Sequence, residues 1–365
     1  MAEARDWPLD ALRGAIMIVM ALDHANDFIA GQHPAPEMWT GVPRYVDAVP
    51  FVTRLVTHLA APGFFFLMGV SLWLLAVSRR RTGWTTRQIT LHLMARGAIL
   101  IVLQFFVENR AWPIGQTGGF PIYFGVLFGL GAAMIFGSLL LNVRSSLLLG
   151  ISAALILITE VVVGSASARV AYSVVVRALI IPGTTGSVLV YYPVVPWLGV
   201  TGLGIAFGRW LKRDRAAAYR GAGLIGVIAL VLFVVLRALG DFGNIRSALT
   251  ANWIDVLNVV KYPPAIVFLL LTLGIDLLLL RAFSRAGQVA PRWLKPIIVL
   301  GQSPLFFYLV HLYLYAILGL IVGHDLGILR MLPFWLFGLL ILLPLCWLYG
   351  QFKQRQPMTS VWRLL

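Results

Sequence analysis

Long runs of apolar residues recur along the whole chain, and only short polar segments separate them. A helix of about 20 apolar residues is long enough to cross a bilayer. The pattern predicts ten such spans, at residues 9–30, 57–78, 88–108, 120–141, 146–163, 192–210, 220–239, 262–281, 296–322 and 328–350. We therefore expect one all-α domain over residues 1–365, a polytopic transmembrane helix bundle.

One further apolar stretch, at residues 168–181, is short and is followed by Pro182, Gly183 and Gly186. We interpret it as a helix that lies on the outer face or re-enters the membrane, because backbone of that kind is tolerated beside protein or water. The alternative is an eleventh span, which would reverse the sidedness of every loop that follows it.

Composition supports a membrane protein, since 60% of the residues are hydrophobic and only 12% are charged, against about a quarter charged in soluble domains. The formal net charge of +15 could also indicate nucleic acid binding. However, Lys and Arg are about twice as frequent in the loops on the N-terminal side as in the opposite loops, which is typical of the cytoplasmic side. We therefore predict that both termini are cytoplasmic and that nucleic acid is not a partner.

Several kinds of chemistry are not expected. The N-terminal segment has no small-residue cleavage site after its apolar run, so we predict that the first span is retained. The only cysteine, Cys346, lies within the last apolar run, where inert packing is the expected role. The histidines lack the compact spacing of a metal site, so no metal is predicted.

The first span carries ionisable residues, which are costly inside a membrane and usually face a cavity or each other. His24 lies roughly 22 Å from the start of this helix, next to Asp23 and within one turn of Asp27. A carboxylate beside an imidazole can orient it for acid–base chemistry near neutral pH. We predict that Asp23 or Asp27 orients His24 in a reaction centre. A hydrogen-bonded structural histidine is the alternative.

Other polar residues fall in the same half of the bundle, between its midplane and the outer surface. Their similar depth along the predicted helices is consistent with one cavity that opens to the outside. These residues are His33, His58, Asn109, Arg110, Asn258, Lys261, Tyr262 and His311. We predict a catalytic role for His58 and His311 and substrate binding for the others. For His58 and His311, contact with headgroups or aromatic packing explains the position equally well.

Several motifs, taken together and in this order, carry a resemblance to a known family. They are residues 9–14 (LDALRG) with 22–24 (LDH), 60–69, 192–200, 261–264 with 271–274, and 300–308 with His311. The chain resembles bacterial members of the heparan-alpha-glucosaminide N-acetyltransferase catalytic-domain family. Enzymes of this family are understood to pass acetyl from cytosolic acetyl-CoA to a glucosamine amine across the membrane.

The resemblance implies a multi-pass acyltransferase of the bacterial inner membrane, with membrane lipids around it. Acetyl-CoA or another acyl-CoA would be the donor, with Arg13 and Asp10 near its phosphates, although helix capping and lipid phosphates also explain these two residues. An amine or hydroxyl of an envelope sugar or glycan would be the acceptor. Characterised members have asparagine at the position of His24, a histidine close to the position of His33 and an aspartate near His58. Either His24 or His33 would then act as the base, or His24 would carry the acyl group.

A second family is similar at the opening only. Asp10, Arg13, Gly14 and His24 match the start of the acyltransferase family 3 membrane enzymes, which O-acylate envelope polysaccharides. The stretches 192–197 and 261–264 fit the first family better.

Two other classes of protein remain as alternatives. A transporter or a lipid or glycan translocator without acyl transfer would show paired repeats with broken helices, and no convincing repeat is present. A structural subunit would have little need for buried Asp23, His24 and His311. The spacing of Gly204 and Gly208 permits a helix contact in a homodimer but does not require one.

Overall fold

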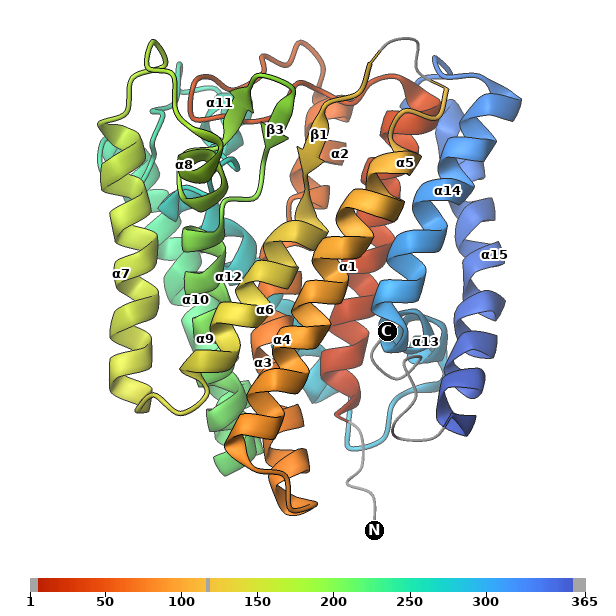
Figure 1. The fold of residues 1–365 in the computed structure, drawn as a ribbon. Helices are drawn as coiled ribbons and strands as arrows, with labels where there is room; N and C mark the ends of the chain where they lie inside the picture. Colours follow the sequence, from red (N-terminus) through yellow and green to blue (C-terminus); the bar gives the residue numbers. More distant parts are fainter. Residues whose placement is uncertain (1–5, 116–118, 357–365) are drawn as a thin grey trace.

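The computed structural model describes residues 6–115 and 119–356 as a bundle of long helices (Figure 1). We call the end of the bundle where α1 begins the N-terminal face, and the other end the distal face. The long elements are α1 (Trp7–Ala25) with π-helical η1 (Asn26–Ala30), α3 (Ala60–Arg81), α4 (Thr86–Leu103) with π-helical η2 (Gln104–Glu108), α6 (Val126–Leu140), α7 (Ser145–Gly164), α9 (Val194–Arg213), α10 (Arg215–Leu239), α12 (Ile266–Arg285), α14 (Pro304–Val322) and α15 (Ile328–Arg355). The short helices are α2 (Ala48–Thr57), α5 (Asn109–Ala111), α8 (Val174–Leu179), α11 (Trp253–Leu257), η3 (Arg292–Leu294) and α13 (Lys295–Gln302).

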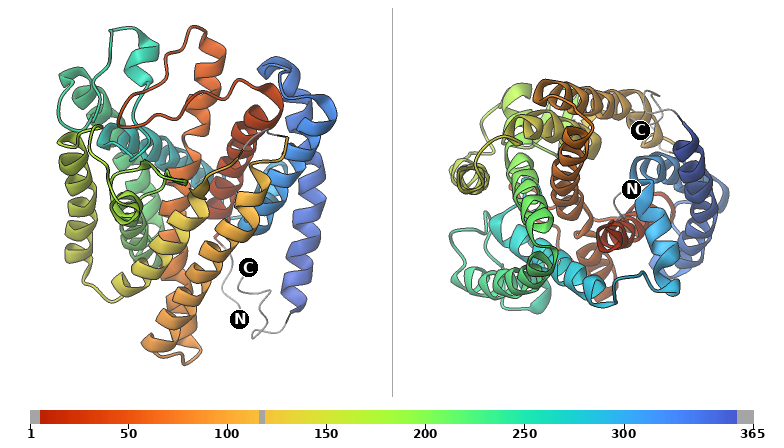
Figure 2. Two further views of the ribbon diagram at one scale, coloured as in Figure 1. Left: turned by 45° about the horizontal axis from the view of Figure 1, so that its top comes forward. Right: turned by 90° about the horizontal axis from the view of Figure 1, so that it is seen from below.

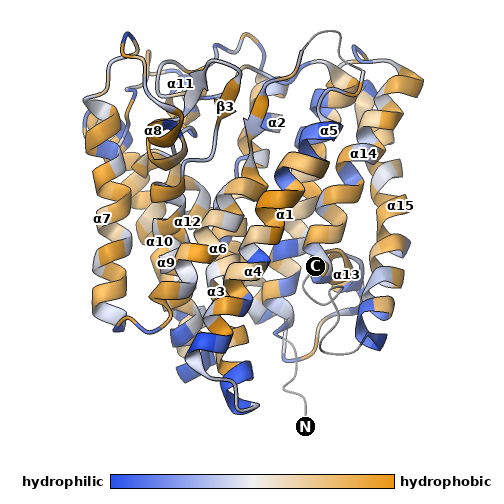
Figure 3. Ribbon diagram, in the orientation of Figure 1, coloured by the Kyte–Doolittle hydropathy of each residue, from blue (hydrophilic) through white to orange (hydrophobic). Residues whose placement is uncertain are grey.

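Eight helical segments of the described residues are long and apolar enough to cross a membrane. They are residues 48–81 and 86–111, α7, α9, α10, α12, α14 and α15. Helix α6 is apolar but has only 15 residues, and α1 carries Asp10, Arg13 and Asp23. The predicted all-α, polytopic transmembrane bundle is confirmed, and Figure 3 shows hydrophobic residues along the helices with hydrophilic residues concentrated at the two faces.

The structure corrects several predicted boundaries. The span predicted at 296–322 is two helices, because Pro304 begins α14 and Ser303 between them is not helical. The span predicted at 57–78 continues toward the distal face as α2, with a break at His58 and Leu59. The segment 168–181 contains only the six-residue α8, about 9 Å long, which cannot cross a bilayer.

Close backbone contacts between helices occur where glycines face a neighbour. An added side chain on Gly69 of α3 would clash with the Thr201 carbonyl of α9, and one on Gly204 of α9 would clash with the Phe66 carbonyl of α3. Gly208 faces Val70 of α3 in the same way. Gly204 and Gly208 therefore serve packing inside the chain, and they give no support to a homodimer contact.

A small sheet lies over the bundle at the distal face (Figure 1). Strand β1 (Ile122–Phe124) pairs in parallel with β3 (Val188–Val190), and β2 (Gly183–Thr185) pairs antiparallel with β3. Figure 2, seen from below, shows α1 between the helices α13 to α15 on one side and α3 and α12 on the other. The distal half of α1 thus points toward the sheet, and the candidate site forms between them.

Candidate active site

A cavity of about 230 Å³ lies in the distal half of the bundle. Polar and aromatic side chains from α1, η1, the loop after η1, α2, η2, the turn after α5, β1, the loops before α9 and α12, and α14 surround it. They include Asp23, His24, Asp27, His33, Arg54, Glu108, Trp112, Tyr123, Tyr191, Tyr192, Lys261, Tyr262 and Tyr308. Segments far apart in the sequence therefore meet at one place.

Both π-helical segments border this cavity. Segment η1 continues α1 and carries Asp27, and η2 continues α4 and carries Glu108. A π-turn is wider than an α-turn and occurs often at functional sites, because it changes the direction of the following side chains. Segment η1 ends at Gly31, whose φ of 63° lies in the left-handed region that favours glycine.

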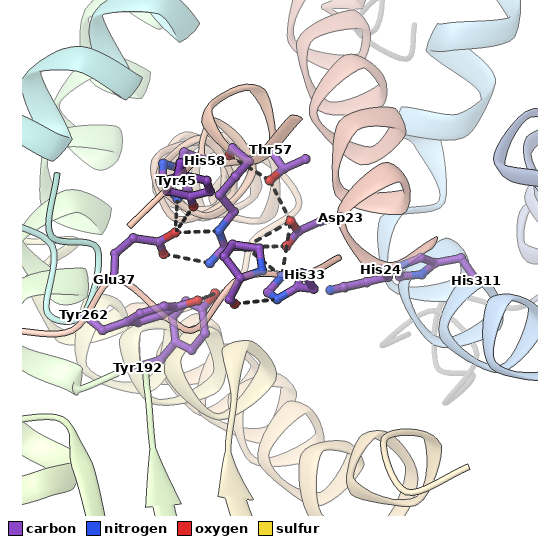
Figure 4. A network of polar contacts seen from close by, with 12 residues as sticks. Asp23, His24, His33, Glu37, Tyr45, Thr57, His58, Tyr192, Tyr262 and His311 are labelled. Carbon is purple, nitrogen blue, oxygen red and sulfur yellow. Dashed lines mark hydrogen bonds and ion pairs between the residues drawn. The ribbon is translucent and has the colours of Figure 1, made fainter. Parts of the chain in front are cut away.

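Arg54 of α2 is the centre of a buried ion-pair network. Figure 4 shows its partners Asp23 and Glu37 on opposite sides of this network. Its Nε and Nη2 donate to the two carboxylate oxygens of Glu37, each at 2.8 Å. Its Nη1 donates to both oxygens of Asp23, at 3.0 and 2.9 Å. Arg54 is 2% exposed and Glu37 is fully buried, so each charge depends on its partner for compensation.

Glu37 lies in the loop between η1 and α2, outside the spanning helices. Burial alone would raise the pKa of its carboxyl, but the guanidinium of Arg54 holds that pKa well below its usual range. His58 Nε2 is 3.3 Å from Glu37 Oε1, and His58 does not border the cavity. Glu37 is therefore a charged anchor that fixes the position of Arg54.

His24 and His311 form a hydrogen-bonded pair, with His24 Nδ1 2.7 Å from His311 Nε2. The Nδ1 of His311 lies 3.0 Å from the Phe307 carbonyl, which can only accept a hydrogen bond. A neutral His311 therefore carries its proton on Nδ1, and its Nε2 accepts from His24. It follows that Nε2 of a neutral His24 is unprotonated, and no hydrogen-bond partner for it exists among the described residues.

The prediction that Asp23 orients His24 is wrong. Successive residues on a helix do not face each other, and Asp23 instead accepts from Arg54 and from Thr57 Oγ1 at 2.7 Å. Asp27 borders the cavity but makes no hydrogen bond to His24. The orienting partner is His311, 287 positions along the chain.

The other predicted site residues divide into two groups. His33, Lys261 and Tyr262 border the cavity, with His33 Nε2 2.9 Å from Arg54 Nη1 and the Lys261 amine 5.1 Å from the centre of the Tyr262 ring. The residues His58, Asn109, Arg110 and Asn258 do not border it. Asn258 donates to the Pro43 carbonyl and holds a loop, and Asn109 accepts from Gln104.

Sequence reasoning missed Arg54 and Glu37, although both are central to the site. Arg54 is a cation in an otherwise apolar segment, VPFVTRLVT, which was a usable signal. Glu37 stands in an irregular loop rich in proline, and nothing in that pattern predicts complete burial. The aromatic residues Trp112, Tyr123 and Tyr308 also border the cavity and had not been expected there.

A second cavity, of about 310 Å³, lies between the first and the N-terminal face. Its walls are mostly apolar and come from α3, α4, α6 and α14, while Arg13, Arg96 and Lys353 supply three cations. Arg13 pairs with Asp10 at 2.7 Å and donates to Ser71 Oγ at 3.2 Å. Tyr308 and Val126 border both cavities, so these two side chains separate one from the other.

A grouping of three or more His, Cys, Asp or Glu side chains suited to a metal ion is absent from the part of the chain that the structure describes. Cys346 is buried and unpaired, as the apolar run around it indicates. The groups that border the distal cavity are imidazole, carboxylate, guanidinium, amine, phenol and indole groups.

One cavity holds an imidazole nitrogen without a proton and a second cavity is lined by cations, an arrangement chemically suited to group transfer within a membrane. Residues 5–233 match the protein family described as heparan-alpha-glucosaminide N-acetyltransferase, catalytic. The chain belongs to this family, which implies transmembrane acetyltransferase activity. A comparison with curated proteins finds no match. The motifs at 261–264 and 300–308 lie outside the matched residues, yet Lys261, Tyr262 and Tyr308 border the distal cavity.

Proposed function

We propose that this enzyme takes an acyl group, acetyl in the simplest case, from acyl-CoA on the N-terminal face and transfers it to an amine or hydroxyl of a sugar on the distal side. The observation that carries the proposal is the arrangement of two cavities in series, separated by Tyr308 and Val126. In this proposal the N-terminal face is cytoplasmic, as the excess of Lys and Arg in its loops favours.

His24 is the proposed catalytic base. Its Nε2 takes the proton of the acceptor amine or hydroxyl as that group attacks the thioester carbonyl. The new C–N or C–O bond forms, the C–S bond breaks, and the proton passes from His24 to the departing CoA thiolate. In the alternative order His24 Nε2 attacks the thioester carbonyl, the C–S bond breaks and CoA leaves as a thiolate. The acceptor then attacks the acyl group on Nε2, the C–N bond to His24 breaks, and the proton of the acceptor passes to the thiolate. The hydrogen bond to His311 holds the reactive tautomer in both cases.

Lys261 and Tyr262 are the proposed groups for the acyl carbonyl oxygen. Both border the cavity, and Lys261 is 4% exposed, so its charge acts in surroundings from which most water is excluded. Negative charge develops on that oxygen in the transition state, and a fixed donor or cation stabilises it strongly there. The Arg54 charge is already balanced by Asp23 and Glu37 and is therefore less suited to this role.

Aromatic rings supply the proposed acceptor site. Trp112, Tyr123, Tyr191 and Tyr262 border the cavity, and the Tyr191 and Tyr262 ring centres are 4.8 Å apart. Such rings combine a flat apolar surface with a polar edge, which suits one apolar and one hydroxyl-rich side of a sugar. Asp23, Asp27 and His33 lie close enough to the same space to bind hydroxyl or amine groups.

The N-terminal cavity is the proposed donor site. Three cations, Arg13, Arg96 and Lys353, border it, and Asp10 is the acidic group paired with Arg13. Phosphate groups pair well with guanidinium and ammonium groups. The apolar wall between these cations and Tyr308 would then accommodate the pantetheine arm and direct the thioester toward His24.

The test is release of free CoA from acetyl-CoA by the purified protein in liposomes, with glucosamine or envelope extract as acceptor. We expect His24→Ala to lower turnover by about 100-fold to 10,000-fold, the usual contribution of a positioned base. His92→Ala is the matched control, because His92 packs on Trp84 of the α3–α4 connection and borders neither cavity. Equal turnover of wild type and His24→Ala would remove His24 from the mechanism. No release from any acyl-CoA by wild type would favour a carrier without acyl transfer.

A further inference from the structure

A third cavity, of about 620 Å³, shares no lining residue with the two cavities of the proposed reaction. Helices α7, α9, α10 and α12 surround it. Its apolar wall includes Phe66, Leu149, Ile156, Phe207, Leu270 and Leu277. The polar residues that border it are Ser145, Arg209 and Arg213. All three belong to the end of the bundle at the N-terminal face, where α9 ends and α7 begins.

The third cavity opens toward the surface that meets the membrane. Helix α7 packs on α9, and α10 packs on α12, so α7 and α10 form two sides with α9 and α12 between them (Figure 2). Leu149 of α7 and Ile225 of α10 border the cavity and are 47% and 44% exposed. Exposed apolar residues on two sides of a hollow indicate an occupant that comes from the membrane.

The part of the cavity next to the N-terminal face has the length of one leaflet. On α7 its lining runs from Ser145, the first residue of that helix, to Ile156, which corresponds to roughly 16 Å along a helix. The hydrocarbon core of a bilayer is about 30 Å thick, so a leaflet contributes about half of that. On α12 the lining continues to Ile266, the first residue of that helix on the distal side, so the cavity extends beyond the space that one tail needs.

The cationic end selects the headgroup. Arg209 and Arg213 are one turn apart on α9 and therefore share a face. The Arg209 guanidinium donates to the Val143 carbonyl at 2.6 Å and to the Leu141 carbonyl at 3.1 Å, which holds it in place while its charge stays without an acidic partner. Arg213 is exposed and forms no hydrogen bond or ion pair with the described residues.

We propose that this cavity binds an anionic glycerophospholipid from the leaflet at the N-terminal face, with a tail between α7 and α10 and the phosphate at Arg209 and Arg213. The apolar wall explains the affinity for a tail. The two cations at the headgroup level explain a preference for net negative charge over a zwitterion. This site is separate from the acyl-transfer site and does not depend on the proposed function.

Native mass spectrometry of the protein, after reconstitution in equal amounts of phosphatidylglycerol and phosphatidylethanolamine with the same tails, tests the proposal. Wild type should retain phosphatidylglycerol preferentially, and Arg213→Gln should lower the ratio of the two retained lipids about fivefold. Arg87→Gln is the matched control, because Arg87 is exposed at the same face and borders no described cavity. An equal ratio in Arg213→Gln and Arg87→Gln would overturn the headgroup assignment.

A second variant tests the tail. Ala206 borders the cavity from α9, and Ala206→Phe places a ring in the space of the tail. We expect retention of both lipids to fall about tenfold, because the ring displaces part of the tail and about two methylene groups of that tail lose their burial. Unchanged retention would overturn the proposal. A wild-type dimer that Ala206→Phe dissociates would overturn it too, because a second copy of the chain would then occupy the cavity.

Discussion

The distal and N-terminal cavities differ in how their charges are compensated. In the distal cavity, Arg54 lies between Asp23 and Glu37 at hydrogen-bond distance, so its charge is paired with carboxylates inside the protein. Among the described residues that border the N-terminal cavity, Arg13, Arg96 and Lys353 are cations and none is acidic, although Arg13 pairs with Asp10 outside the lining. A hydrogen-bonded network of paired charges fixes geometry, while a lining of cations attracts an anionic ligand.

This difference agrees with the proposed roles of the two cavities, acyl transfer in the distal cavity and donor binding in the N-terminal cavity. Transfer to the acceptor needs groups held within a fraction of an ångström, which a hydrogen-bonded network supplies. Binding a donor that carries phosphates needs net positive charge and tolerates more freedom. We therefore expect variants at the distal cavity to affect folding and turnover, and variants at the N-terminal cavity to affect donor affinity.

The largest expected effect comes from Arg54. Arg54→Met leaves Asp23 and Glu37 buried without their cation, and breaking a buried pair in this way costs about 3–5 kcal/mol. Thermal unfolding of the detergent-solubilised protein should show a marked loss of stability. Arg110→Met is the control, because Arg110 is exposed and borders neither cavity. Equal unfolding temperatures for the two variants would contradict the central role of the Arg54 network.

The second prediction concerns His311 as a positioning residue. His311→Ala removes the acceptor of the His24 Nδ1 proton, so the reactive tautomer is no longer held, and turnover should fall about 100-fold. His311→Gln offers a carbonyl acceptor and should restore part of it. The pH dependence of kcat/KM should change in both variants, which a purely structural role would not produce. If His311→Ala turns over like wild type, another group orients His24.

The sequence predicted the class of fold and about half of the candidate site. Apolar periodicity found the bundle, and polar residues inside long helices found His24 and His311 because such residues are costly unless used. His33 and Lys261 lie in loops and were found by their position at the outer ends of the predicted spans. Local spacing favoured Asp23 as the partner of His24, whereas the actual partner, His311, is on α14. A contact between residues on two helices far apart in the sequence depends on how the helices pack, and no local pattern in a single sequence predicts it.

The residues that sequence reasoning placed wrongly share one cause. Asn109, Arg110 and Asn258 lie at the predicted depth, but they do not border the cavity. Depth along a helix follows from residue counting, while the direction of a side chain around the bundle axis depends on which helices are neighbours. Loops are harder still, since Glu37 is completely buried in a segment that has no regular secondary structure.

The third prediction concerns donor affinity. Arg96→Gln removes a cation of the N-terminal cavity and should raise the KM for acetyl-CoA about fivefold to tenfold, with kcat nearly unchanged. The difference between wild type and variant should shrink as salt is added, because screening weakens the lost interaction. Arg87→Gln, at the same face but outside the cavity, is the matched control. A fall in kcat with unchanged KM would place Arg96 in the chemical step instead.

The smallest expected effect comes from a buried acid outside both cavities. Asp276 of α12 is 1% exposed, faces Gly63 and Ile16 in the bundle interior, and neither of its carboxylate oxygens has a hydrogen-bond partner. An isolated buried charge is very costly, so we expect this carboxyl to be protonated. Asp276→Asn then exchanges one neutral group for another of the same shape, and the unfolding temperature and turnover should stay close to wild type. Asp23→Asn is the contrasting variant, because Asp23 accepts from Arg54 as a charged group and the substitution removes one of the two ion pairs of that cation. If Asp276→Asn proves as harmful as Asp23→Asn, the bundle interior holds a second charged site, and balanced charge is not confined to the distal cavity.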